Sequence, residues 1–208
     1  NGLLARVTQN AALNVYRVSD NVTAQYVQYL SSPNPASAGD IYEPLDASTT
    51  WTNLYDNMTN TFDLDKQAGE QGATQYQGVA RILMAMDLQL VHDLWGDAPF
   101  TEAFGGEILT PAYDDAQANY QRVITLLDEG MSLLQQAGST IELSATADLI
   151  HEGDVDAWIK TAHALKARML NRVSKTDQYN AANVLAEVDA AYDAGDDEAA
   201  ITVFDVRN

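Results

Sequence analysis

Apolar side chains recur every three or four residues along the middle of the chain, which is the spacing of one face of an α-helix. The clearest run consists of Val79, Ile82, Leu83, Met86, Leu90 and Leu94. Gly96 follows where a helix end often needs a positive φ, and Pro99 prevents the helix from resuming. The pattern therefore predicts a helix that ends at about Trp95.

The same periodicity predicts three helices in the second half of the chain. They cover residues 114–138, 154–173 and 177–193. Asp114 and Gln117, three residues apart, fit a capping box at the start of the first. Gly138 and Gly195 stand where the first and the last would end.

The N-terminal half is less regular. Residues 5–31 predict one long helix, bent near Ser19, and residues 51–68 predict another. Between them, residues 32–50 are rich in Ser, Pro, Ala, Gly and Asp, and a loop of that length is usually functional or disordered. Residues 200–208 predict a short strand.

Taken together, these elements predict an all-α fold in which antiparallel helix pairs stack as a tetratricopeptide-like scaffold with long loops. The strict 34-residue signature of that repeat is absent, so the prediction depends on helix length and order alone.

The acidic charge of the chain limits the classes of ligand that it can bind. Asp and Glu number 30 against 11 Lys and Arg, a formal net charge of -19, which repels phosphate backbones and argues against nucleic-acid binding. Neutral sugars, peptides and cations remain compatible ligands. The absence of Cys excludes disulfides, thiol catalysis and zinc–thiolate sites within this sequence. No apolar run approaches the roughly 20 residues of a membrane helix.

Catalytic and metal motifs are missing. His92, His151 and His163 form no HExxH pair, and no Walker, GxGxxG or GxSxG motif occurs. The alternating acids from Asp63 lack the Gly and Glu of a calcium loop, and the acidic stretch from Asp193 fits a solvated turn. We expect no enzyme activity, no cofactor and no metal site. An all-α glycosidase stays open, because two carboxylates across a cleft need no local motif.

Aromatic residues are the other chemical resource. A flat ring stacks on the apolar face of a pyranose while nearby polar groups bind its hydroxyls. Tyr42, Trp51 and Trp95 lie in or beside predicted loops and are the candidate ligand-binding residues. The alternative is structural: Trp51 would anchor the helix that it starts, and Trp95 would pack under its turn.

Three segments of the chain resemble three motifs of one protein family, and they occur in the same order. In the first, "YQGVARILMAMDLQLVHDLWGDAPFTEAFGG", residues 80–83 and 95–103 match a helix that leads into a Gly-Asp-x-Pro turn. In the second, the matching residues are Pro111, Tyr113, Asp114, Gln117 and Tyr120. In the third, they are Asp148, Ile150, Gly153, Asp154, Trp158, Lys160, Ala162, Leu165 and Arg168. This series resembles the SusD/RagB family of outer-membrane nutrient-binding lipoproteins.

The resemblance implies a non-enzymatic glycan-binding protein on the cell surface, lipid-anchored in the outer membrane. Its partners would be an oligosaccharide and a SusC-like TonB-dependent transporter, to which it delivers the nutrient. A peptide-binding member of the family and a helical-repeat interaction scaffold are the alternatives. Residues 1–208 are expected to form a single SusD-like helical domain, the N-terminal part of a longer protein, because the family is about twice this length and the lipid-bearing Cys is absent.

Roles can be assigned within these segments. Asp97 is expected to accept backbone N–H groups in its own turn, and Phe100 to pack on the helix end. Arg81 and Arg168 are expected to bridge helices through carboxylates. We expect the ligand at the loop of residues 32–50, because loops on a rigid frame carry recognition.

Overall fold

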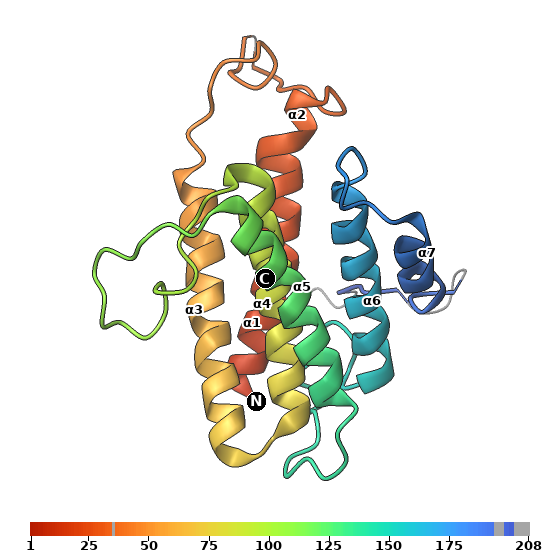
Figure 1. The fold of residues 1–208 in the computed structure, drawn as a ribbon. Coiled ribbons are helices and arrows are strands. Elements are labelled where there is room, and N and C mark those ends of the chain that lie inside the picture. Colours follow the sequence, from red (N-terminus) through yellow and green to blue (C-terminus); the bar gives the residue numbers. More distant parts are fainter. Residues whose placement is uncertain (35, 194–197, 202–208) are drawn as a thin grey trace.

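The computed structural model of the protein describes residues 1–34, 36–193 and 198–201. Their regular structure is helical throughout (Figure 1), which confirms the all-α prediction. The elements are α1 (Gly2–Arg17), the π-helical η1 (Val18–Thr23), α2 (Ala24–Tyr26), α3 (Ser48–Gln71), α4 (Thr74–Trp95), α5 (Ala116–Leu134), α6 (Val155–Arg172) and α7 (Ala181–Asp189). Residues 200 and 201 of the predicted final strand are irregular, and the rest of it lies outside the described residues.

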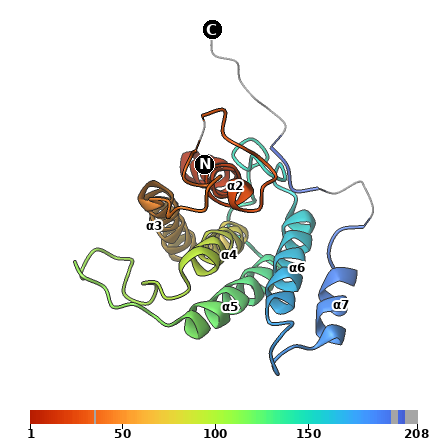
Figure 2. The ribbon, with the colours of Figure 1, turned by 90° about the horizontal axis from the view of Figure 1, so that it is seen from above.

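The long helices lie side by side, and α4 is at their centre (Figures 1 and 2). It packs against α1, α3, α5 and α6. Consecutive helices from α3 onward run antiparallel, as the predicted tetratricopeptide-like stacking requires. Because α4 is surrounded, apolar residues occur on nearly all its faces and not in one stripe.

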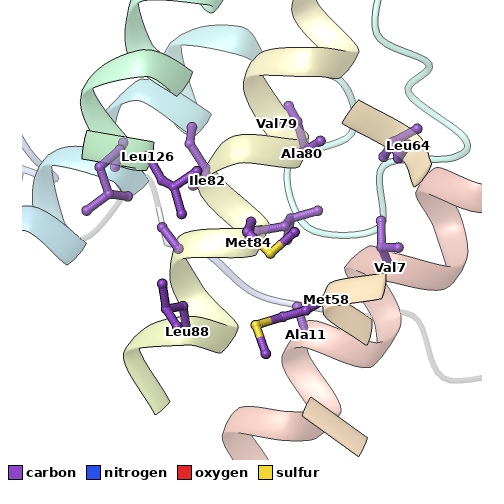
Figure 3. Close-up of a cluster of buried hydrophobic side chains, with 14 of the residues drawn as sticks. Val7, Ala11, Met58, Leu64, Val79, Ala80, Ile82, Met84, Leu88 and Leu126 are labelled. Atoms are coloured by element: carbon purple, nitrogen blue, oxygen red, sulfur yellow. The ribbon is translucent and has the colours of Figure 1, made fainter. Parts of the chain in front are cut away.

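The core forms where three helices meet α4 (Figure 3). The side chains α4 contributes there include Val79, Ala80, Ile82, Met84 and Leu88. Those of the neighbouring helices include Val7, Ala11, Met58, Leu64 and Leu126. All ten are buried, so this layer holds the frame together through removal of apolar surface from water.

The first long helix is shorter than predicted. The bend expected near Ser19 is a π-helical turn, in which the hydroxyl of Thr23 donates to the backbone carbonyls of Val18 and Ser19. Regular helix then ends at Tyr26 instead of continuing to residue 31, and Gln28 adopts a φ of 58°. The segment after it is therefore available to the loop that precedes α3.

Two predicted caps differ from the structure. The N-cap of α5 is Asp115, whose carboxylate accepts the N–H of Ala118 at 2.7 Å, so the capping box predicted at Asp114 is wrong. The helix predicted over residues 177–193 is limited to α7, because Asn180 caps it and its C-cap is Ala190. Asp154, where the predicted helix over residues 154–173 begins, is the N-cap of α6.

Two glycines let α4 and α5 approach closely. A Cβ added at Gly78 would lie 2.8 Å from the carbonyl oxygen of Gly130, and one added at Gly130 would lie 3.0 Å from that of Gly78. Real Cβ atoms rarely come that near a backbone oxygen. The crossing therefore depends on the absence of a side chain at both positions.

The third sequence motif holds the start of α6. The buried Asp148 carboxylate accepts the indole N–H of Trp158 at 2.6 Å. It also accepts backbone N–H groups of Ile150, His151 and Gly153. A single carboxylate thus fixes both the turn before α6 and the fully buried tryptophan inside it, which explains why an Asp and a Trp stand ten residues apart in the motif.

Ion pairs link neighbouring helices. Arg81 of α4 contacts Asp65 of α3 at 2.9 Å and Glu129 of α5 at 2.7 Å, which confirms the bridging role predicted for it. From α6, Arg172 pairs with Asp93 of α4. Arg168 lines a groove between helices, and its charge also acts on the Asp93 carboxylate.

A polar cluster lies inside the core between α1, α3 and α4. The Asp87 carboxylate accepts the amide N–H groups of Asn14 at 3.1 Å and Asn57 at 2.7 Å. Burial raises the pKa of Asp87 to about 7, although the two hydrogen bonds act in the opposite direction. Nothing in the apolar periodicity of the sequence points to this cluster.

Candidate ligand-binding site

The chain reverses after α4 through a short turn that the start of α5 holds in place. Gly96 takes a φ of 72°, and the Asp97 carboxylate accepts the N–H of Ala116 at 2.8 Å. The Asn119 amide donates to the carbonyls of Gly96 and Ala98, at 3.2 and 3.1 Å. Asp97 therefore joins the turn to α5 instead of binding inside the turn as predicted, and the motif is architectural.

Asp114 closes the loop that follows this turn. Its carboxylate accepts the N–H of Phe100 at 2.7 Å, and the N–H and hydroxyl of Thr101 at 2.9 and 2.6 Å. Its backbone pairs with Ala98 in an antiparallel bridge. Partial burial acts to raise the pKa of Asp114. These hydrogen bonds and the charge of Arg122 outweigh it, so the pKa of Asp114 is lowered. The loop, seen on the left of Figure 1, is thus anchored at its base.

Four aromatic rings meet above this base. The Trp51 ring centroid lies 4.6 Å from Tyr55, 4.9 Å from Trp95 in an edge-to-face arrangement, and 6.4 Å from Tyr113 in a stacked one. The hydroxyl of Tyr55 donates to the carbonyl of Pro99 at 2.7 Å. We call Trp51, Tyr55, Trp95 and Tyr113 the aromatic cluster. It joins the first turns of α3 to the end of α4 and to the segment that precedes α5.

The cluster combines a packed base with an open ring. Trp51, Tyr55 and Trp95 are half-buried against the core, whereas Tyr113 is 66% exposed. Part of the cluster is therefore structural, as the alternative for Trp51 and Trp95 expects. The exposed tyrosine face beside two indoles is also an apolar surface with a polar edge, which suits stacking against a sugar ring.

Tyr42, the third predicted ligand residue, lies in a different aromatic pair. Its ring centroid is 6.2 Å from that of Tyr26, and it is 59% exposed with a φ of 59°. The hydroxyl of Tyr26 donates to the carbonyl of Glu43 at 2.6 Å, which holds the loop against the end of α2. The structure thus brings Trp51 and Trp95 together and places Tyr42 in a separate pair.

Polar groups surround a depression of about 410 Å³ beside the first turns of α3. They come from α1, η1, the preceding loop and α3, and include Arg17, Asn21, Asp46, Thr49 and Asn53. Amide, hydroxyl, carboxylate and guanidinium groups are the partners that sugar hydroxyls need. Because Trp51 belongs to the same turns of α3, stacking and hydrogen-bonding groups occur close together along the chain.

A smaller pocket of about 250 Å³ lies on the α3–α4–α5 side. The rings of Phe62, Phe100 and Phe104 pack against one another in its wall, with centroids 5.4 to 5.7 Å apart. The Arg122 guanidinium lies 5.6 Å from the Phe100 centroid. Phe100 thus packs into this group as well as against the core, and the pocket combines apolar walls with the charged side chains of Arg122, Arg81 and Asp65.

His163 and His151 hydrogen-bond to protein side chains, whereas the buried Nδ1 of His92 has no hydrogen-bond partner among the described residues. His163 contacts Glu187 at 2.6 Å, and His151 contacts the hydroxyl of Thr161 at 2.7 Å. Burial lowers the pKa of His92. Within the described part of the chain, no group of three His, Cys, Asp or Glu side chains is arranged to hold a metal ion. The acidic segment from Asp63 is part of α3 and forms no loop.

Two members of the aromatic cluster were not predicted as ligand residues. Tyr55 follows Trp51 by four residues, and this spacing on a helix is a usable signal. Tyr113 is far from both tryptophans in sequence, and only the pairing of Ala98 with Asp114 brings it near. No local sequence pattern predicts the backbone pairing of Ala98 with Asp114.

Comparison with known proteins places the chain in a family. The SusD-like family, described as "Starch-binding associating with outer membrane", matches residues 1–207. No curated protein matches the sequence. Among the residues that the structure describes, no helix has the length and hydropathy to cross a membrane.

Solved structures agree with this match. A SusD/RagB family protein of Bacteroides thetaiotaomicron superposes with a TM-score of 0.84 at 26% identity, over 100% of this chain and 46% of that one. A chitin-binding protein gives 0.74 at 25% identity, over 93% and 44%. A chitin-binding SusD homolog of Flavobacterium johnsoniae gives 0.73 at 22% identity, over 89% and 40%. The chain thus spans less than half the length of these structures, and it belongs to the SusD-like family.

Proposed function

We propose that the protein is a non-enzymatic glycan-binding protein of the cell surface that delivers oligosaccharide to a SusC-like TonB-dependent transporter. Family membership and the chitin-binding relatives support the ligand class. The cell outer membrane is the proposed location. A lipid anchor would lie outside residues 1–208, which contain no Cys. We further propose that these residues are a single domain, the N-terminal part of a longer protein.

The aromatic cluster is the observation that carries this proposal. Tyr113 presents a largely open face, and Trp51 and Trp95 form an edge-to-face pair beside it. The cluster is supported by Asp114 and by the hydrogen bond from Tyr55 to Pro99. A surface held by two helices and an anchored loop costs little conformational entropy when a ligand stacks on it.

The test is calorimetric titration with chito- and malto-oligosaccharides. Trp51→Ala and Tyr113→Ala should each weaken binding about tenfold or more, which corresponds to about 1.4 kcal/mol. Tyr29→Ala is the matched control, because this tyrosine is 86% exposed and outside the cluster. Tyr42→Ala measures separately the contribution predicted for the preceding loop.

Two results would oppose the proposal. Wild-type affinity in both cluster variants would place the glycan elsewhere. Release of reducing ends during incubation with any of the oligosaccharides would indicate hydrolysis and revive the glycosidase alternative. Circular dichroism of each variant confirms that the helices are retained, so that a loss of affinity can be assigned to the site.

A peptide-binding role is the second candidate. The pocket lined by Phe62, Phe100 and Phe104 would accept an apolar side chain, and Arg122 at its edge would attract a carboxylate. Parallel screening of a glycan array and a peptide library separates the two roles. Binding only to peptides, with loss in Arg122→Gln and not in Tyr113→Ala, would favour this alternative.

A further inference from the structure

The depression of about 410 Å³ beside the first turns of α3, which we call the α3 depression, is bordered by a helix end with unused hydrogen-bond donors. No side chain at the N-cap, Ala47, binds this end, and the first turn contains no acidic residue. The Asp46 carboxylate accepts the N–H of Ser48 at 2.9 Å. Among the residues that the structure describes, the backbone N–H groups of Thr49 and Thr50 have no acceptor. Because a helix N-terminus carries partial positive charge, these two groups favour an anion.

A buried hydroxyl group belongs to the wall of the α3 depression. Thr50 is 8% exposed, and its hydroxyl makes no hydrogen bond within the described part of the chain. A helical threonine often donates to the carbonyl four residues earlier, as Thr59 and Thr61 of α3 do at 2.9 and 2.8 Å. A buried polar group without a partner is costly, so this hydroxyl points to a ligand oxygen in the depression.

A cation completes the set of groups. Arg17, the last residue of α1, lines the α3 depression and makes no ion pair with any residue that the structure describes. One turn earlier, the Asn14 amide donates to the carbonyl of Asn53 at 3.4 Å, which fixes the end of α1 against α3. Although the chain has 30 acidic residues, this guanidinium is therefore available to a carboxylate that a ligand brings.

We propose that the α3 depression binds the carboxylate of an acidic sugar, such as a uronic acid unit of an oligosaccharide. The carboxylate accepts hydrogen bonds from Arg17, from the Thr50 hydroxyl and from the first N–H groups of α3. The amides of Asn21 and Asn53, which also line the depression, bind hydroxyl groups of the same sugar. The inference rests on the proposed glycan-binding function and names the charged class of glycan that the site prefers.

Two sources of negative charge act against an anion at this place. Asp46 lines the α3 depression, but its carboxylate is exposed to water and already accepts the N–H of Ser48. The net charge of -19 is spread over the whole chain, and physiological salt screens exposed charges beyond about 8 Å. Direct contacts with Arg17 and the end of α3 therefore decide the affinity.

Calorimetric titration of the full-length protein compares trigalacturonate with its methyl ester, which keeps the sugar rings and removes the charge, and with maltotriose. The wild type should bind trigalacturonate about tenfold or more tightly than the ester. Arg17→Gln should abolish this preference. Thr50→Val keeps the shape of the side chain without its hydroxyl, and should weaken only trigalacturonate, about threefold or more.

Arg6→Gln is the matched control, because this arginine is exposed on the same helix and outside the α3 depression. It should keep the wild-type preference. Circular dichroism checks the fold of each variant. If the buried Thr50→Val change prevents folding, Arg17→Gln at the helix end still tests the inference.

Equal affinity of the wild type for trigalacturonate and its ester would overturn the inference, as would a full preference retained in Arg17→Gln. Inorganic phosphate that competes as strongly as trigalacturonate would indicate an anion site without sugar recognition and would also overturn it. Failure of the glycan proposal looks different: neither the ester nor maltotriose then binds, and Tyr113→Ala changes nothing.

Discussion

At the scale of single residues, Asp87 makes the stability of the fold depend on pH. Its carboxyl group is fully buried and its pKa is raised from 3.8 to about 7. A group whose pKa is higher in the folded state favours folding most when it is protonated. The contribution of this group to the free energy of unfolding is complete below pH 3.8 and is lost as the pH rises through about 7.

Asp87→Asn should remove this pH dependence and stabilise the protein at pH 8. The effect is up to about 4 kcal/mol, since one pKa unit corresponds to about 1.4 kcal/mol. The amide can be accommodated, because Asn57 Oδ1 is buried with no acceptor role among the described residues and can receive its N–H after a flip. Urea unfolding between pH 4 and 8 measures the change.

Asp56→Asn, at an exposed position of α3, is the control and should keep the wild-type pH profile. If Asp87→Asn also keeps that profile, the buried carboxyl group does not carry the dependence.

Tyr55→Phe should destabilise the protein by about 1–2 kcal/mol, because it leaves the buried Pro99 carbonyl without its 2.7 Å hydrogen bond. Chemical unfolding measures the loss. Tyr29→Phe removes a hydroxyl from an 86% exposed ring and should change nothing. Equal stability of the two variants would show that the loop after α4 does not depend on this bond.

At the scale of elements, the crossing of α4 and α5 is limited by backbone contact. Gly78 and Gly130 each face the carbonyl oxygen of the other. Alanine has the higher helix propensity by about 1 kcal/mol, so propensity alone would favour replacing both. The close approach of the two backbones opposes these replacements. Measurement of variant stability separates the effect of helix propensity from that of the close approach.

Gly130→Ala should destabilise the protein by about 1–3 kcal/mol, because the helices must move apart. Gly78→Ala should do the same, and the double variant should cost less than the sum of the two, since one separation accommodates both methyl groups. Ser132→Ala on the exposed face of α5 is the control. A stabilised Gly130→Ala variant would mean that propensity decides at this crossing.

The sequence predicts those elements whose causes are local. Apolar spacing locates α4 and α6, and the helix start predicted at Asp154 agrees with the N-cap of α6. The capping box predicted at Asp114 is wrong, because the Asp114 carboxylate accepts the backbone N–H groups of Phe100 and Thr101 across the loop. Tyr113 and the Asp87 cluster were missed for the same reason: both depend on segments that are distant in sequence, and no window along the chain contains them.

On the scale of the whole molecule, the excess of acidic residues sets the response to salt. A net charge of -19 on a chain of 208 residues gives a self-repulsion that favours expansion. Ion pairs such as Arg81 with Asp65 and Glu129 oppose it only locally. Exposed pairs of this kind contribute about 1 kcal/mol or less.

Raising NaCl from 10 to 500 mM should therefore raise the melting temperature by a few degrees, because the Debye length falls from about 30 Å to a few Å. Differential scanning calorimetry measures the melting temperature at each salt concentration, and sorbitol at equal osmolality is the control for solvent effects. A melting temperature that falls with salt would mean that the helix-linking ion pairs outweigh the repulsion.

The clamp at the base of the loop after α4 has a practical consequence. Asp97 ties one end of the loop to Ala116 at the start of α5, and Asp114 ties Phe100 to the other end, whereas Leu109 between them is 95% exposed. The exposed part of the loop around Leu109 can thus change in length without disturbing the helices. The same property makes this part of the loop a suitable insertion point for an epitope or a fluorescent reporter.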